Sequence, residues 1–184
     1  MNSVLEKTLK ELSEINKGLD LTQELQSEIN PEVFFRRNSV NLLVGKKGSG
    51  KTYNVFREII KLRYVPDHHY TKLLYVSDKA YDPTYERVKH LIPLSVEKVK
   101  YDRAAESIAK LAEAKVAVHD IIKNDINLDD LTEDSKNNIQ EIVGTEIDKN
   151  NEVYHSIVLL DDCQNIFDHK TRQNEKLFKL LFEN

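Results

Sequence analysis

A glycine-rich segment that carries a lysine and a threonine has residue types that could hold phosphate. It reads GKKGSGKT over residues 45–52 and matches the pattern G-x-x-x-x-G-K-[ST]. Glycines let the backbone pass through positive φ and bring its N–H groups close to an anion, and a helix that begins there adds partial positive charge. We therefore predict a phosphate-binding loop in which Lys51 reaches the β- and γ-phosphates and the Thr52 hydroxyl binds Mg²⁺.

The expected nucleotide contacts are spread over the whole of this segment. Lys46 and Lys47 are not required by the pattern, so they either add positive potential or are simply solvated. The simpler alternative for the segment is a glycine-rich turn beside a surface lysine. The predicted nucleotide-binding residues are Gly45, Lys46, Lys47, Gly48, Ser49, Gly50, Lys51 and Thr52.

A pair of aspartates follows an apolar run near the end of the chain. In SIVLLDDCQN, four apolar residues at 157–160 precede Asp161 and Asp162. Ligands collect at the carboxyl ends of strands in open α/β sheets. We expect Asp161 to hold Mg²⁺, through water, and Asp162 to orient or deprotonate the attacking water, with Lys51 as the second catalytic residue. Alone, the pair would indicate an acidic turn after a core strand.

Other phosphate-binding classes fit the sequence less well. None of the five glycines follows an aspartate at the spacing of a GTPase switch, and no guanine-reading Asn-Lys-x-Asp follows the loop. A small-molecule kinase typically has an arginine-rich lid, whereas residues 124–152 contain no arginine. The adjacent aspartates favour hydrolysis of ATP by water.

Apolar runs that alternate with helical patterns must position these residues. This alternation predicts an α/β fold with a mainly parallel sheet covered by helices on both faces. Asp82 is the expected N-cap of the second helix. The expected strands span residues 39–45, 72–77, 96–101 and 156–160, and the expected helices span 51–64, 83–91, 103–123 and 174–182.

The chain divides into an arm and a core. Residues 1–33 have leucines at three- and four-residue spacing, which predicts an amphipathic helix. That helix either docks on the core or forms a partner-binding arm. Residues 34–184 form the expected ATPase core. Within it, the polar stretch 124–152 is expected to be a surface excursion with one weak helix, either a mobile acidic loop or a lid over the site.

Composition limits the class of protein. The 184 residues are 40% hydrophobic and 32% charged, and the net charge of −4 argues against a general polycation that coats nucleic acid. We expect no membrane span and no signal peptide, since the N-terminal MNSVLEKTLK lacks an apolar core. With a single cysteine, no internal disulfide is possible, so we expect a reducing, cytoplasm-like compartment and no secretion.

Four segments of the chain carry a family resemblance: LLVGKKGSGKT, KLLYVSDKAYDPTYERV, SIVLLDDCQN and TRQNEKLFKLLFEN. In these segments the chain resembles the genome-packaging ATPases of large double-stranded DNA viruses and virophages, the poxvirus-type branch of the FtsK–HerA superfamily. The resemblance spans about residues 34–184. It implies a P-loop NTPase fold, ATP and Mg²⁺, a homo-oligomeric ring, and sequence-independent translocation of viral double-stranded DNA into a capsid in the host cytoplasm or virion.

The sequence departs from the family in one respect. Family members continue past the closing helix into a core strand with a polar sensor, usually Gln, and no counterpart precedes Asn184. Two alternatives to the packaging motor therefore stay open. The first is a nucleotide-binding oligomerisation module with little catalysis, and the second is a small-molecule kinase. Arg87 and Arg103 are candidates for the arginine that such rings insert into a neighbouring site. A DNA-facing basic patch is a further possibility, formed by Arg36, Arg37, Arg57, Lys61, Arg63 and Lys72.

Overall fold

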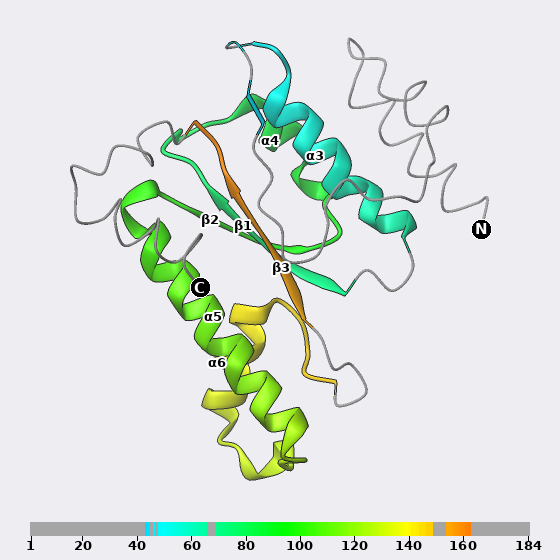
Figure 1. Ribbon diagram of the computed structural model, residues 1–184, viewed down its shortest axis with the longest axis vertical. Helices are drawn as coiled ribbons and strands as arrows, with labels where there is room; N and C mark the ends of the chain where they lie inside the picture. The colour runs from blue at the N-terminus through cyan, green and yellow to red at the C-terminus, as the bar shows by residue number, and fades with distance from the viewer. Residues whose placement is uncertain (1–42, 45, 47, 66–68, 149–153, 163–184) are drawn as a thin grey trace.

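Three parallel strands form the sheet in the part of the chain that a computed structural model describes (Figure 1). The structure describes residues 43–44, 46, 48–65, 69–148 and 154–162. Strand β1 (Tyr70–Val76) lies between β2 (Ser95–Val99) and β3 (His155–Leu160). The expectation of a parallel sheet flanked by helices is confirmed. The expected arm, the expected first strand at 39–45 apart from residues 43 and 44, and the expected last helix lie outside the described residues.

Within the described ranges, four α-helices and three short 3-10 helices accompany the strands. The helical patterns locate most of them to within two residues, and the acidic N-cap expected at position 82 is confirmed. The helices are α3 (Lys51–Lys61), α4 (Pro83–Val88), α5 (Tyr101–Lys123) and α6 (Glu133–Val143), and the 3-10 helices are η1 (Leu62–Tyr64), η2 (Lys89–Leu91) and η3 (Leu128–Asp130).

Side chains of β1 alternate between two apolar layers because successive residues of a strand point to opposite faces. Leu73 and Tyr75 pack with the buried side chains of α3 and with the α4–η2 segment. Leu74 and Val76 pack with the first two turns of α5 on the other face. These four side chains are at most 1% exposed, so β1 is the centre of the core.

The excursion at 124–152 is folded where it is described. Helix α6 begins at the N-cap Thr132 and ends at Gly144, and its Val143 packs against Val118 and Ile121 of α5 in a third apolar cluster. The alternative of a mobile acidic loop is therefore wrong for residues 124–148, while the expected helix is confirmed. This packing was hard to predict from the sequence, because the apolar residues of α6 are widely spaced.

Helix α6 lies at the edge of the sheet where the strands begin (Figure 1). The Thr71 hydroxyl donates to the Val143 carbonyl at 2.6 Å, and the Lys72 ammonium donates to the Glu141 carbonyl at 3.0 Å. These two groups satisfy carbonyls that the end of a helix leaves without intrahelical partners. Because the aspartates follow the other end of β3, the alternative of a lid over them is also wrong for this helix.

Among the described residues, no helix combines the length and apolar character that crossing a bilayer requires.

Candidate functional site

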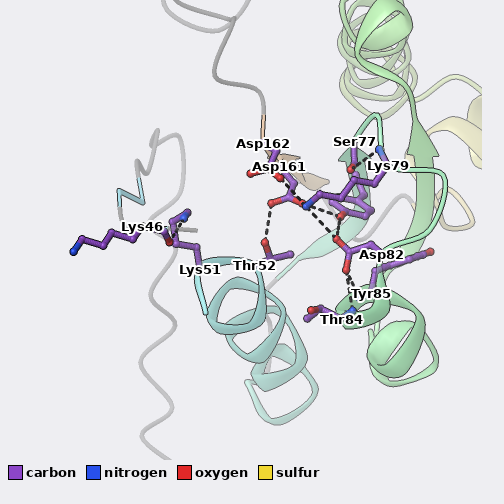
Figure 2. Close-up of polar contacts among 11 residues, drawn as sticks. Lys46, Lys51, Thr52, Ser77, Lys79, Asp82, Thr84, Tyr85, Asp161 and Asp162 are labelled. Atoms are coloured by element: carbon purple, nitrogen blue, oxygen red, sulfur yellow. Dashed lines mark hydrogen bonds and ion pairs between the residues drawn. The ribbon is translucent and has the colours of Figure 1, made fainter. Parts of the chain in front are cut away.

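The carboxyl ends of the parallel strands bring together residues that are far apart in the sequence. Val76 and Leu160 are register partners at the ends of β1 and β3. Asp161, the residue that follows β3, donates its backbone N–H to the Val76 carbonyl at 3.0 Å. The segment that follows β1 therefore lies beside the segment that follows β3, and α3 begins at the same edge (Figure 2).

The Thr52 hydroxyl and the Asp161 carboxylate meet directly. The hydroxyl donates to Asp161 Oδ1 at 2.7 Å, although the residues are 109 positions apart. Thr52 lies in the first turn of α3, and only 10% of the Asp161 side chain is exposed. The sequence predicted both residues as Mg²⁺ ligands on separate grounds, and the fold places them within hydrogen-bonding distance.

The start of α3 has the backbone that the glycine pattern predicts. Gly50 is the N-cap with φ 79°, in the left-handed region, and its carbonyl accepts the first helical hydrogen bond from the Asn54 N–H at 2.9 Å. The Lys51 ammonium donates to the Lys46 carbonyl at 3.0 Å, across the loop. Gly45 and Lys47 lie outside the described residues. No acidic residue occupies the first turn of α3, so its partial positive charge faces the loop.

Asp162 has a backbone conformation that is uncommon for a residue other than glycine. Its φ is 54°, in the left-handed region, which Asp tolerates better than most residues. This conformation ends β3 and turns the Asp162 side chain outward, where 54% of it is exposed. A backbone strain of about 1 kcal/mol at such a position is a common feature of functional sites.

Lys79 is one of two residues at this site that the sequence analysis missed. Its ammonium lies 2.8 Å from Asp162 Oδ2, 3.0 Å from Asp161 Oδ2 and 3.7 Å from Asp82 Oδ2 (Figure 2). The hydrogen bond to Asp162, followed by that to Asp161, raises the pKa of Lys79 above its ordinary value. One positive charge thus faces three carboxylates.

Tyr75 was also missed, and its buried hydroxyl connects two of these carboxylates. It lies 3.0 Å from Asp82 Oδ2 and 3.2 Å from Asp161 Oδ2. With one proton, the hydroxyl donates to one carboxylate at a time. Burial is the main reason that the pKa of Tyr75 is raised, and the neighbouring carboxylates add to it, so the hydroxyl remains a donor.

Asp82 has a second function as the N-cap of α4. Its Oδ1 accepts from the Thr84 N–H at 2.8 Å and the Tyr85 N–H at 3.1 Å. Burial by itself would raise the pKa of Asp82, but the hydrogen bonds from Tyr85 N–H, the Tyr75 hydroxyl and Thr84 N–H lower it. Asp82 is therefore an anchored carboxylate that fixes the end of the loop between β1 and α4.

A signal for these residues was present in the sequence. Lys79 and Asp82 lie two and five residues after the apolar run KLLYVS, as the aspartate pair follows SIVLL. The rule that polar residues after parallel strands share one edge applies to both segments. The sequence does not say that β1 and β3 are neighbours, because β2 lies between them in chain order.

Other predicted residues are not brought to this site. Arg87 is an exposed residue of α4, and Arg103 is an exposed residue of the first turn of α5. Neither makes a contact with the aspartate pair that the structure records. Their suggested action on a neighbouring subunit stays a prediction.

The structure removes Lys72 from the suggested DNA-facing patch. Lys72 is only 5% exposed, because it caps α6 and pairs with Glu97 at 3.4 Å. Lys61 pairs with Glu58 at 3.0 Å, and Arg57 Nε lies 3.6 Å from the same carboxylate. Arg63 is exposed, while the two arginines at 36 and 37 lie outside the described residues. DNA binding by the remaining members of this patch stays a prediction.

The donor set at the site fits a hard divalent cation that arrives with a phosphate ligand. A hydroxyl and a carboxylate 2.7 Å apart are oxygen ligands, which Mg²⁺ prefers, and Mg²⁺ commonly takes its remaining ligands from phosphate and water. Within the described ranges, no group of three or more His, Cys, Asp or Glu residues is placed to hold a metal ion by itself.

Comparison of the chain with protein-family models, with curated proteins and with solved structures found no match.

Proposed function

We propose that this protein is a P-loop NTPase that binds ATP with Mg²⁺ and hydrolyses it. The observation that carries the proposal is the hydrogen bond between Thr52 and Asp161, which joins the glycine-rich segment to the aspartate pair. A chance glycine-rich turn would give no reason for its threonine to meet an aspartate 109 residues away.

Each residue has a defined task in this proposal. Backbone N–H groups of residues 45–52 and the start of α3 bind the phosphate chain, and Lys51 leaves the Lys46 carbonyl to contact the terminal phosphates. Thr52 and Asp161 would hold Mg²⁺, which neutralises phosphate charge. Asp162, whose side chain is about half exposed, accepts the proton of the attacking water.

We further propose that hydrolysis drives translocation of double-stranded DNA by a homo-oligomeric ring, as in viral genome packaging. The support for this finer proposal is the resemblance of four sequence segments to packaging ATPases. Contacts with DNA would be made to phosphates and would not depend on base sequence.

The alternative with specific support is a nucleotide-binding module that turns over little ATP. In the structure, Asp162 is ion-paired with Lys79 at 2.8 Å, and a carboxylate held in this way is a poor proton acceptor. This alternative requires that nucleotide binding leave the ion pair in place.

The test is nucleotide binding and ATP turnover at saturating Mg²⁺, with and without long double-stranded DNA, alongside light scattering for mass. Lys51→Ala should abolish nucleotide binding, and Asp162→Asn should keep binding and lose turnover. Lys110→Ala is the matched control, because Lys110 is an exposed lysine of α5 that pairs with Glu106 at 2.8 Å.

The outcomes separate the proposals. Turnover stimulated by DNA in an oligomer supports the motor, whereas binding without turnover supports the module. Equal nucleotide binding by the parent and Lys51→Ala would reject the nucleotide site itself. Turnover by Asp162→Asn at the parental rate would reject the role of Asp162 alone.

A further inference from the structure

The acidic end of β3 already holds a cation that belongs to the chain. The Lys79 ammonium lies within 4 Å of the three carboxylates of Asp82, Asp161 and Asp162, at 3.7, 3.0 and 2.8 Å. At such distances a unit charge interacts with each carboxylate by a substantial Coulomb energy, even when solvent reduces it. The ammonium therefore offsets the mutual repulsion of these three negative charges.

The ammonium and the Thr52 hydroxyl occupy different oxygens of one carboxylate. Thr52 donates to Asp161 Oδ1 at 2.7 Å, whereas Lys79 lies against Oδ2 at 3.0 Å. A divalent cation bound through Asp161 therefore comes next to the ammonium, and two adjacent cations repel each other. The metal and the ammonium compete for the same negative charge.

The backbone that carries Lys79 is fixed, so its side chain is the part that can move. Asp78 Oδ1 accepts from the Tyr101 N–H at the start of α5 at 2.9 Å, and Asp82 caps α4 on the other side. The side chain of Lys79 is 40% exposed, and a lysine carries its ammonium on a flexible four-carbon stem. Anchors on both sides let the ammonium leave the carboxylates without unfolding the loop.

Building on the proposed function, we infer that Lys79 is a resident counter-ion that keeps free divalent metal out of the site until a nucleotide brings one. The metal–nucleotide complex displaces the ammonium from Asp161 and Asp162. The released ammonium then has the terminal phosphate as its nearest new partner, and Asp162 becomes available to water. Lys79 is thus a positioning residue for the metal-binding step, in addition to the residues that the sequence motifs identify.

The first test measures Mn²⁺ binding to the full chain in the absence of nucleotide, by electron paramagnetic resonance of free Mn²⁺. Lys79→Met removes the charge and keeps most of the side-chain volume, and it should bind Mn²⁺ at least about tenfold more tightly than the parent. Lys79→Arg keeps the charge and should resemble the parent. The control is Lys89→Met, because Lys89 is a nearby exposed lysine that pairs with Glu86 at 2.8 Å.

Equal Mn²⁺ affinity in the parent and in folded Lys79→Met overturns the inference, as does equal tightening in Lys89→Met. Lys79→Gln, which keeps hydrogen-bond donors, replaces Lys79→Met if circular dichroism shows that the latter is unfolded.

These results are separable from failure of the proposed function. If the parent binds no nucleotide but Lys79→Met gains a Mn²⁺ site, the counter-ion role stands and the ATPase proposal fails. If the parent binds Mg²⁺–ATP and Lys79→Met shows no change in Mn²⁺ affinity, the ATPase proposal stands and the counter-ion role fails.

Discussion

At the scale of single residues, Tyr75 combines complete burial with polar contacts to two carboxylates. Its ring is fully buried and packs edge-on against Phe56, with 5.4 Å between the ring centroids. Its hydroxyl contacts two carboxylates. A buried hydroxyl that serves charged groups contributes more to stability than one that serves neutral groups. The ring stabilises the core and the hydroxyl orients the site, so the two functions can be separated by removing one oxygen.

We expect Tyr75→Phe to lower the free energy of unfolding by about 1–2 kcal/mol, because Asp82 and Asp161 lose a buried donor. Urea denaturation measures the change. Tyr85→Phe is the control: the Tyr85 ring packs on Tyr75 at 5.1 Å, and the structure records no hydrogen bond of its hydroxyl within the described residues. Equal losses in the two variants would contradict a special role for the Tyr75 hydroxyl.

Asp82 gives a pH dependence at the same scale. Its pKa in the folded protein lies below the ordinary 3.8, so between these two values the unfolded chain binds more protons than the folded one. Its contribution to stability is therefore complete above about pH 4 and is lost as the pH falls through the folded pKa. Asp82→Asn keeps an N-cap but cannot titrate, and its unfolding free energy should fall less steeply than that of the parent from pH 5 to pH 2.5.

In that comparison the remaining carboxylates serve as an internal control, because they titrate in both proteins. Unfolding free energies that change in parallel over this range would show that Asp82 has the same pKa in the folded and unfolded chains.

At the scale of elements, the contact between α6 and the sheet depends on one glycine. Gly144 ends α6 with φ 83°, and a Cβ added there would lie 2.7 Å from Ser95 Cβ and 2.8 Å from the Thr71 carbonyl oxygen. The helix end and the starts of β1 and β2 therefore approach more closely than any side chain allows. This contact holds the α5–α6 pair against the edge of the sheet where the strands begin.

Gly144→Ala should lower the free energy of unfolding by about 2 kcal/mol or more, since the new Cβ combines an unfavourable φ with a clash against backbone atoms. Gly48→Ala is a matched comparison for stability, because Gly48 has φ 80° but nothing lies within 4 Å of an added Cβ. Gly48→Ala should lower the free energy of unfolding by about 1 kcal/mol, because only the unfavourable φ contributes. Equal losses in urea denaturation would mean that the close approach of α6 contributes nothing.

The elements also show what the sequence can predict. Apolar runs located β1 and β3, because strands of a parallel sheet that is covered on both faces are nearly continuous in apolar residues. The sequence also predicted β2, although Ser95–Val99 includes Glu97 and Lys98. The pairing of Thr52 with Asp161 followed from known motif chemistry. The contacts of Lys79 and Tyr75 were not predictable in the same way, since they depend on which strands are neighbours, and chain order does not specify that. Helix α6 was underestimated because a few well-placed apolar side chains on a polar helix suffice to bury one face.

At the scale of the whole molecule, the two edges of the sheet have different roles. The edge where strands end carries the candidate site, with residues from α3, from the loop after β1 and from the end of β3 (Figure 2). Helix α6 lies at the edge where the strands begin, and Thr71 and Lys72 donate hydrogen bonds to its carbonyls (Figure 1). The length of β1 separates them, so binding at one edge makes no direct contact with the other.

This arrangement predicts where a nucleotide changes hydrogen exchange. Saturating Mg²⁺–ATP should slow amide exchange at the start of α3, in residues 77–82 and around Asp161, because it orders these segments directly. Exchange in α6 and in the second half of α5 should stay the same. Lys51→Ala with the same nucleotide is the control and should show no slowing anywhere. Protection confined to the α5–α6 pair would place the nucleotide at the opposite edge and would reject the site assembled from Thr52, Lys79 and Asp161.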